Sequence, residues 1–141
     1  MKRNDWTLAG QTAPGEGIVI THNKVNVGGS QNFIVRNIRF RVGQNDSSGE
    51  IIAENALGAE NCANYIFDHC TFGWSVEENM NTADSHFLTV QYSIVHEGLY
   101  DAGHSKGARG YGSQWGGSPA TYHHNLLAHN KSRSPRFNGA R

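Results

Sequence analysis

Four segments of the chain share one alternation of apolar and polar positions. Each begins with a short stretch of apolar, β-branched or aromatic residues, continues through a polar pair, and returns to an apolar stretch. The segments are residues 32–40, 64–72, 86–94 and 120–127. Short runs of this kind, bounded by Gly, Asn and Ser, predict β-strands. Because no window of about 12 residues keeps an apolar stripe at helical spacing, the pattern predicts little helix.

The four segments recur at nearly regular intervals. When they are aligned on Val35, Phe67, Val90 and Tyr122, the steps between them are 32, 23 and 32 residues. A period near 23 residues with insertions of about nine is typical of a repeat architecture. One coil of strands cannot bury its inner face alone, so neighbouring coils are expected to stack as parallel strands. The pattern therefore predicts an all-β solenoid in which the four aligned residues occupy equivalent places.

Stacking of the coils would also align the polar pairs in two columns. The first column would hold Arg36, Asp68, Gln91 and His123, and the second Asn37, His69, Tyr92 and His124. Such columns are expected on an exposed face or at a bend between strands. The insertions fall at residues 43–58 and 98–117, and the second is rich in Gly with polar and aromatic residues. A long loop on a rigid scaffold often carries function, and a loop without function is the alternative.

Composition and charge exclude several classes of protein. The 141 residues suit one domain, and 12 Lys and Arg balance 12 Asp and Glu. A protein that binds nucleic acid in bulk needs a basic surplus to neutralise phosphates, so no nucleic-acid partner is expected. No apolar run approaches the roughly 18 residues of a membrane span. The basic N-terminus is followed by no apolar segment, so no signal peptide is predicted.

Two cysteines, Cys62 and Cys70, lie eight residues apart. If the segment between them is extended, they lie about 26 Å apart, which is beyond the reach of a disulfide. Two buried thiols are therefore expected.

Several short motifs occur in the order found in one enzyme family. They are Gly10-Gln11-Thr12-Ala13-Pro14-Gly15, Phe67-Asp68-His69-Cys70, His123-His124-Asn125 and Arg133-Ser134-Pro135-Arg136. From about Thr7 to Phe137, the sequence resembles the pectate lyases of the right-handed parallel β-helix class. The resemblance implies a single-stranded, right-handed parallel β-helix over residues 1–141, as one partial domain with few coils. The uncapped ends of such a solenoid would favour self-association.

The resemblance implies Ca²⁺-dependent β-elimination of polygalacturonate, an acidic polysaccharide of the plant cell wall. A base would remove the proton next to the uronate carboxylate, and the glycosidic oxygen would leave from the neighbouring carbon. Calcium would stabilise the negative charge that develops on the carboxylate. A secreted or periplasmic location is implied as well, because the polymer cannot enter a cell.

Residues of the implied active site follow from the motifs. Arg133 matches the family's catalytic base in Arg-x-Pro, although guanidinium normally stays protonated and an Arg that only pairs with a substrate carboxylate is the alternative. Lys106 and Arg136 are implied to bind substrate. The family's acidic calcium ligands correspond to Glu77, Asn81 and Asn55. With one carboxylate left among them, a weakened Ca²⁺ site is expected, because affinity follows the charge of the ligands.

Four further residues, Asp68, His69, His123 and His124, belong to motifs that serve the structure of the site in the family. A catalytic Asp68–His69 pair is the alternative. His123 and His124 are expected in a strand rather than as metal ligands, and no ligand spacing typical of zinc occurs. If Arg133 were only a carboxylate clamp, His124 would be the next candidate for the base.

Two other functions stay open. A glycoside hydrolase on the same scaffold would cut with water and two carboxylates. A non-catalytic carbohydrate-binding or structural fragment is the second alternative. It is favoured by the short chain, by the missing acidic ligands and by Asn138, which stands where the family has a further Arg.

Overall fold

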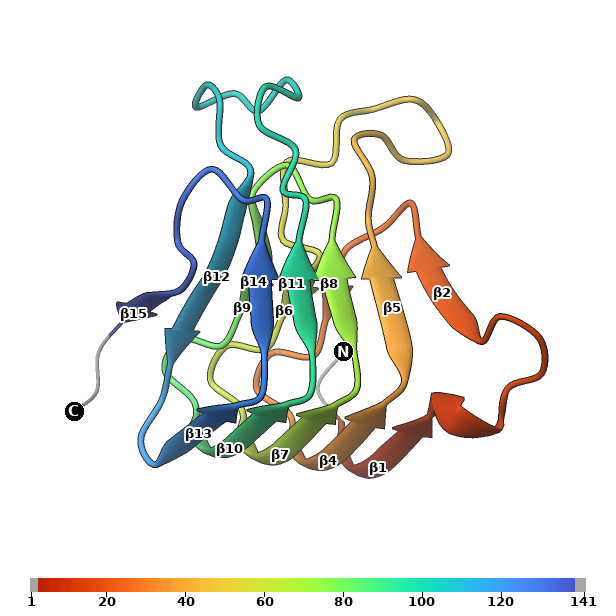
Figure 1. Ribbon diagram of the computed structural model, residues 1–141, viewed down its shortest axis with the longest axis vertical. Helices are drawn as coiled ribbons and strands as arrows, with labels where there is room; N and C mark the ends of the chain where they lie inside the picture. Colours follow the sequence, from red (N-terminus) through yellow and green to blue (C-terminus); the bar gives the residue numbers. More distant parts are fainter. Residues whose placement is uncertain (1–2, 139–141) are drawn as a thin grey trace.

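Three short strands follow one another in each turn of the chain, and five such turns stack side by side (Figure 1). The structure is a computed structural model that describes residues 3–138. Within that range it contains no α-helix, and η1 (Gly10–Thr12) is a single 3-10 turn. The prediction of an all-β solenoid is confirmed. None of the described helical segments is long and apolar enough to cross a membrane.

Corresponding strands of successive turns pair in parallel and form three sheets. Sheet A has the order β1 (Asn4–Ala9), β4 (Gln31–Arg36), β7 (Ala63–Asp68), β10 (His86–Gln91), β13 (Ala120–His123). Sheet B consists of β2 (Ile18–Thr21), β5 (Ile38–Arg41), β8 (Thr71–Gly73), β11 (Ile94–His96), β14 (Leu126–Ala128). Sheet C consists of β3 (Val25–Asn26), β6 (Leu57–Gly58), β9 (Glu78–Asn81), β12 (Tyr111–Gly116), β15 (Arg136–Asn138).

The register of sheet A follows the sequence repeat. Val35 pairs with Phe67, Phe67 with Val90, and Val90 with Tyr122, so the predicted alignment is confirmed. A fifth turn precedes these four, because β1 pairs with β4 and sets Leu8 beside Val35. The sequence repeat did not reveal this turn, since the step of 27 residues from Leu8 to Val35 differs from the other steps.

Stacked aromatic rings fill the interior between the sheets. The rings of Trp6, Phe33 and Tyr65 form one stack with centroids 4.7 Å apart at each step. Phe40 and Phe72 form a second stack at 5.2 Å. Because parallel strands repeat about every 4.8 Å, aromatic residues at equivalent places meet face to face. The period of the sequence therefore determines the packing of the core.

The two polar columns form as predicted, and they lie at the bend between sheets A and B. Asn37, His69, Tyr92 and His124 all have positive φ angles between 48° and 55°. In each of these coils, one residue with left-handed backbone conformation thus turns the chain from its strand in sheet A to its strand in sheet B. The expectation that His124 lies within a strand is wrong, because it occupies this corner, as His69 does. The rings of His69 and His124 stack on Tyr92, with centroids 5.1 Å and 4.7 Å away.

Inside the bend, small polar side chains satisfy backbone groups of the neighbouring coil. Ser93 Oγ accepts a hydrogen bond from the Cys70 N–H at 3.1 Å, and Asn125 Oδ1 accepts one from the Ser93 N–H at 3.0 Å. Both cysteines are free and buried, as predicted. Burial raises the pKa of the Cys70 thiol to about 11. The bend is therefore a packed part of the core rather than a loose connection.

The long connections gather at the corner between sheets B and C, at the top of Figure 1. The first insertion does not remain a loop to residue 58, because Leu57–Gly58 forms strand β6. Its loop part is tied to the second insertion by a hydrogen bond from Gln44 Nε2 to the Ala102 carbonyl at 3.3 Å. The second insertion does not run to residue 117, because Tyr111–Gly116 forms strand β12. The ring of Trp115 in β12 stacks on the Tyr122 ring, with centroids 4.3 Å apart. The Gly-rich sequence around Trp115 gave no indication of this contact.

Candidate functional site

A cluster of acidic, basic and aromatic side chains lies under these connections, where sheet C begins. Its members come from the start of β9, from the loop before β12, and from the loop between β14 and β15. We call it the arginine–glutamate cluster, and it comprises Glu77, Glu78, His104, Arg109, Tyr111 and Arg133.

Glu77 is the acidic centre of one half of this cluster. Arg109 Nη2 donates a hydrogen bond to Glu77 Oε1. His104 Nε2 lies 2.7 Å from Glu77 Oε2, a close contact without the alignment of a hydrogen bond. The side chains of Glu77 and Arg109 are only 16% and 15% exposed. Both oxygens of the carboxylate therefore face partners from the 97–110 loop in a largely buried setting.

Arg133 and Glu78 form the other half. Arg133 Nη1 pairs with Glu78 Oε1, and the Glu78 side chain is 6% exposed. Glu78 and Tyr111 are neighbours in the parallel pairing of β9 with β12. The guanidinium carbons of Arg133 and Arg109 lie 4.1 Å and 4.8 Å from the centroid of the Tyr111 ring. One aromatic ring thus contacts both guanidinium groups, and both distances are within the roughly 6 Å of a cation–π pair.

Burial and a neighbouring cation shift the pKa of Arg133 downward, whereas its ion pair with Glu78 stabilises the protonated form. Burial lowers the pKa of Arg133, the charge of Arg136 lowers it further, and the charge of Glu77 opposes both. The net direction is downward from the ordinary value. A guanidinium that acts as a base needs such a shift.

The expected calcium ligands do not converge. Asn55 Oδ1 accepts a hydrogen bond from the Glu78 N–H at 3.2 Å, which places Asn55 beside the cluster. Asn81 lies at the other end of β9, where its Nδ2 donates to Glu60 Oε1 at 2.7 Å. Its Oδ1 accepts from the Ala83 N–H at 3.0 Å. Asn81 therefore serves the corner that follows β9.

Calcium takes six to eight oxygen ligands. In and beside the arginine–glutamate cluster, one oxygen each of Glu77, Glu78 and Asn55 already pairs with a donor of the protein, and His104 Nε2 lies close to the second oxygen of Glu77. Residues 3–138 hold no group of three or more His, Cys, Asp or Glu side chains arranged to bind a metal. This arrangement does not fit a calcium site on Glu77, Asn81 and Asn55. The metal stays a prediction of the resemblance.

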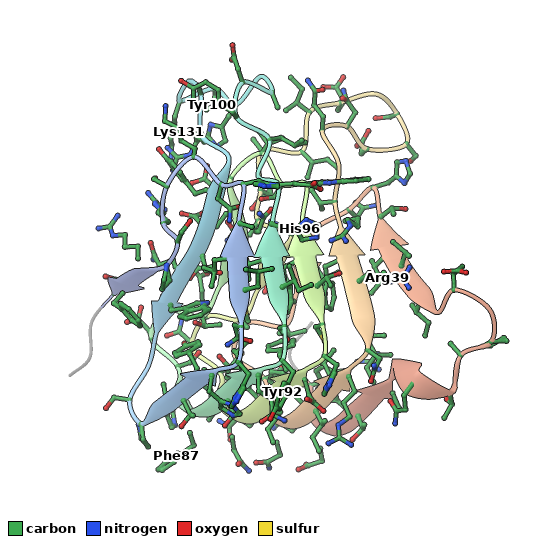
Figure 2. All side chains as sticks on the ribbon, in the orientation of Figure 1. Arg39, Phe87, Tyr92, His96, Tyr100 and Lys131 are labelled. Carbon is green, nitrogen blue, oxygen red and sulfur yellow. The ribbon has the colours of Figure 1, made fainter. Side chains whose placement is uncertain are left out.

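The two residues expected to bind substrate are exposed. Lys106 lies in the 97–110 loop, where its N–H donates to His104 Nδ1 at 3.0 Å. Arg136 begins β15 beside Gln114 of β12. A further cation stands at the rim of the loops, where Lys131 Nζ lies 4.0 Å from the centroid of the Tyr100 ring (Figure 2). Lys106 and Lys131 belong to the two loops that supply Arg109 and Arg133, and Arg136 follows Arg133 by three residues.

The Asp68–His69 pair lies away from this cluster, at the opposite end of sheet B. Asp68 accepts hydrogen bonds from His69 Nδ1 at 2.7 Å and from Gln91 Nε2 at 2.9 Å, and Arg36 Nε lies 3.0 Å away. Its carboxylate thus links three neighbouring coils, which favours the structural interpretation. His123 and His124 share this end, with their Nδ1 atoms 2.6 Å apart. His124 is therefore badly placed to replace Arg133 as a base.

Sequence reasoning missed His104, Arg109 and Tyr111. All three fall in the Gly-rich insertion whose polar and aromatic composition indicated function, but no motif singled them out. Glu78 stood beside the expected position of Glu77 and was not assigned. The structure therefore places Arg133 and Glu77 in one cluster, through partners that spacing alone did not reveal.

Known proteins resemble this chain over most of its length. No protein-family model matches it. The probable pectate lyase C of Aspergillus flavus and that of Aspergillus oryzae are each 37% identical to it over 134 residues. The probable pectate lyase C of Emericella nidulans is 36% identical over 136 residues. Each comparison covers 94% of this chain, and the chain spans about 30% of the length of these relatives. The resemblance drawn from the motifs is confirmed.

Proposed function

Because similarity to pectate lyases runs through 94% of this chain, we propose that it forms the catalytic part of a polysaccharide lyase that cleaves pectate. The reaction is a β-elimination. A base takes the proton from the carbon next to the uronate carboxylate, the electron pair forms a carbon–carbon double bond, and the glycosidic oxygen leaves and takes a proton from solvent. The substrate that this chemistry requires is an acidic polymer of uronate units.

The observation that carries the proposal is the setting of Arg133. Its guanidinium lies between Glu78 and the Tyr111 ring, and its pKa is lowered by burial and by Arg136. A residue at this place in Arg-x-Pro has the two properties that a base needs, a fixed position and an easier loss of its proton. The exposed Lys106 and Arg136 provide charge for the carboxylates of neighbouring sugar units.

Calcium, when bound, would stabilise the charge that develops on the substrate carboxylate. We assign no step to it, because the donors expected to hold it face protein partners. The residues of the chain supply the remaining contributions. Arg133 moves the proton, Tyr111 holds its guanidinium in place, and the neighbouring cations attract the acidic polymer.

A non-catalytic role in binding uronate polymers is the second candidate. It is favoured by the pairing of Arg133 with Glu78, because a buried carboxylate stabilises the protonated guanidinium. In that case the arginine would grip a carboxylate without removing a proton. The hydrolase alternative has less support, since Glu77 and Glu78 are each paired with an arginine rather than free to activate water.

Ultraviolet absorption distinguishes these functions. Elimination leaves an unsaturated uronate that absorbs in the ultraviolet, whereas hydrolysis and binding do not. The protein is incubated with polygalacturonate, and absorption and reducing ends are followed together. A rise in both supports the lyase. Reducing ends without absorption would indicate a hydrolase, and retention on immobilised pectate without either product would indicate a binding protein.

A further inference from the structure

The position expected to hold calcium is occupied by a side chain of the protein. Glu77 is the one carboxylate among the three expected ligands, and its Oε1 accepts a hydrogen bond from Arg109 Nη2. His104 faces the other oxygen at 2.7 Å. A cation that approached Glu77 Oε1 would have to displace the guanidinium first. The carboxylate is thus already neutralised within the fold.

Arg109 is held in this position from several sides. Its backbone N–H donates to the Tyr100 carbonyl at 2.7 Å, which fixes the end of the 97–110 loop. Its guanidinium carbon lies 4.8 Å from the centroid of the Tyr111 ring. The side chain is only 15% exposed. A guanidinium that these contacts hold at the end of the 97–110 loop is preorganised, as an electrostatic catalyst must be.

The hydrogen-bonding capacity of Arg109 is not exhausted. Its Nε is buried and has no hydrogen-bond partner among the residues that the structure describes. Arginine presents five N–H donors in a planar fork that matches a carboxylate. Arg109 thus keeps an unpaired donor beside the proposed base. An arginine that served only to form a salt bridge would not need one.

Arg109 also lies at the correct place relative to the proposed base. The Tyr111 ring contacts the guanidinium groups of both Arg109 and Arg133, and the adjacent Glu77 and Glu78 hold one each. In β-elimination the proton and the carboxylate belong to one sugar unit, so the base and the stabilising cation must lie close together. Because the two guanidinium carbons lie 4.8 Å and 4.1 Å from one ring centroid, the two arginines are close neighbours.

We propose that the Arg109 guanidinium, held on Glu77, takes the place of a metal ion in this site, so that the protein acts on its acidic substrate without calcium. The inference rests on the proposed function, and it adds the identity of the cation. Arg109 pairs with the uronate carboxylate and stabilises the charge that develops there when Arg133 removes the neighbouring proton. Because the stabilising positive charge belongs to Arg109, a calcium chelator removes no charge from the site.

Calcium binding itself provides the first test, and it does not depend on activity. Chelator-treated protein is titrated with CaCl₂ in a calorimeter, and thermal unfolding is measured with and without millimolar calcium. We expect no saturable binding and no rise in the unfolding temperature. The variant Arg109→Gln, which keeps much of the shape without the charge, is expected to gain calcium binding, because Glu77 is then unpaired. Arg39→Ala, an exposed arginine on sheet B (Figure 2), is the control and should behave like the parent.

Cleavage of polygalacturonate provides the second test. The parent protein should keep its rate in excess chelator, and Arg109→Gln should lose at least about tenfold in turnover and regain part of it with calcium. Saturable calcium binding by the parent, or loss of its activity in chelator, would overturn the inference. Failure of Arg109→Gln to gain calcium binding, while it remains folded by circular dichroism, would also overturn it. Absence of cleavage under every condition would instead refute the proposed function, and the calorimetric result would still decide whether Arg109 occupies the place of a metal.

Discussion

The guanidinium carbon of Arg133 lies over the Tyr111 ring, 4.1 Å from its centroid. The two residues come from different turns of the solenoid, since Tyr111 begins β12 and Arg133 precedes β15. Tyr111 is fixed by its pairing with Glu78 of β9. A strand in the middle of sheet C therefore positions an arginine that belongs to a loop.

This contact predicts that Tyr111 acts through Arg133. A cation–π contact contributes about 0.5–2 kcal/mol, so Tyr111→Ala should lower turnover roughly 3- to 30-fold with a smaller change in KM. Tyr111→Phe keeps the ring and should retain most of the rate. Steady-state kinetics on polygalacturonate checks both variants. Equal losses in the two variants would show that the hydroxyl group, rather than the ring, is what matters.

Stability should depend strongly on the aromatic interior. Phe67 is 0% exposed and makes edge contacts with the rings of Phe33 and Phe72. Phe67→Ala should lower the free energy of unfolding by about 3–5 kcal/mol, because it removes buried area and leaves a cavity. Phe87 is 62% exposed, so Phe87→Ala is the matched control and should change stability by less than about 0.5 kcal/mol. Urea denaturation measures both, and similar values would contradict the assigned core.

The same residues show why sheet A could be predicted from the sequence. Val35, Phe67 and Val90 are buried at equivalent places, and burial demands apolar side chains at a fixed period. The period of polar residues at the corners followed from the same stacking. Strand β12 escaped prediction, because its glycines allow close approach of neighbouring backbones and leave no apolar pattern. At Gly116, for example, an added Cβ would lie 2.7 Å from the Asn138 carbonyl oxygen.

The candidate site was less predictable, for a physical reason. Arg133 and Glu77 could be found because each occupies a motif position. Arg109 lies 32 residues from Glu77 along the chain, and only the stacking of β12 on β9 and the path of its loop bring the two together. No local sequence spacing predicts the contact between Arg109 and Glu77. The motif residues could thus be predicted from the sequence, whereas their contact partners could be identified only in the structure.

Asp68 should make stability depend on pH in acid. Burial raises the pKa of Asp68, but hydrogen bonds from Gln91 and His69 and the charge of Arg36 outweigh it, so that the pKa lies below its ordinary value of 3.8. A carboxyl whose pKa is depressed by folding stabilises the protein above its unfolded pKa, and that contribution is lost as pH falls through the folded pKa. The stabilisation by Asp68 should therefore be complete near neutral pH and decline below about pH 4.

The variant Asp68→Asn tests this directly. It should unfold at a lower temperature than the parent at pH 7, and the difference should shrink between about pH 4 and pH 2. Thermal unfolding followed by circular dichroism across this range gives the comparison. A difference that stays constant down to pH 2 would show that the charge of Asp68 does not contribute, and that the amide disturbs the corner by its shape.

The role of Arg133 as a base predicts two separable effects. Arg133→Ala should lower turnover at least about a hundredfold with little effect on substrate binding, as loss of a group that acts in the transition state requires. Arg133→Lys should not restore the rate, because the planar guanidinium fork is lost. By contrast, Arg136→Ala should mainly raise KM, since Arg136 is exposed and expected to grip a distant carboxylate.

The variant Glu78→Gln then separates a base from a clamp. The carboxylate of Glu78 pairs with Arg133 and stabilises its protonated form. Removing that negative charge should lower the pKa of Arg133 further, so the neutral, basic form exists at lower pH. If Arg133 is the base, the alkaline rise of the pH–rate profile should move to lower pH in Glu78→Gln. If Arg133 only grips a carboxylate, the profile keeps its position and KM alone changes, because a clamp stays protonated in both proteins.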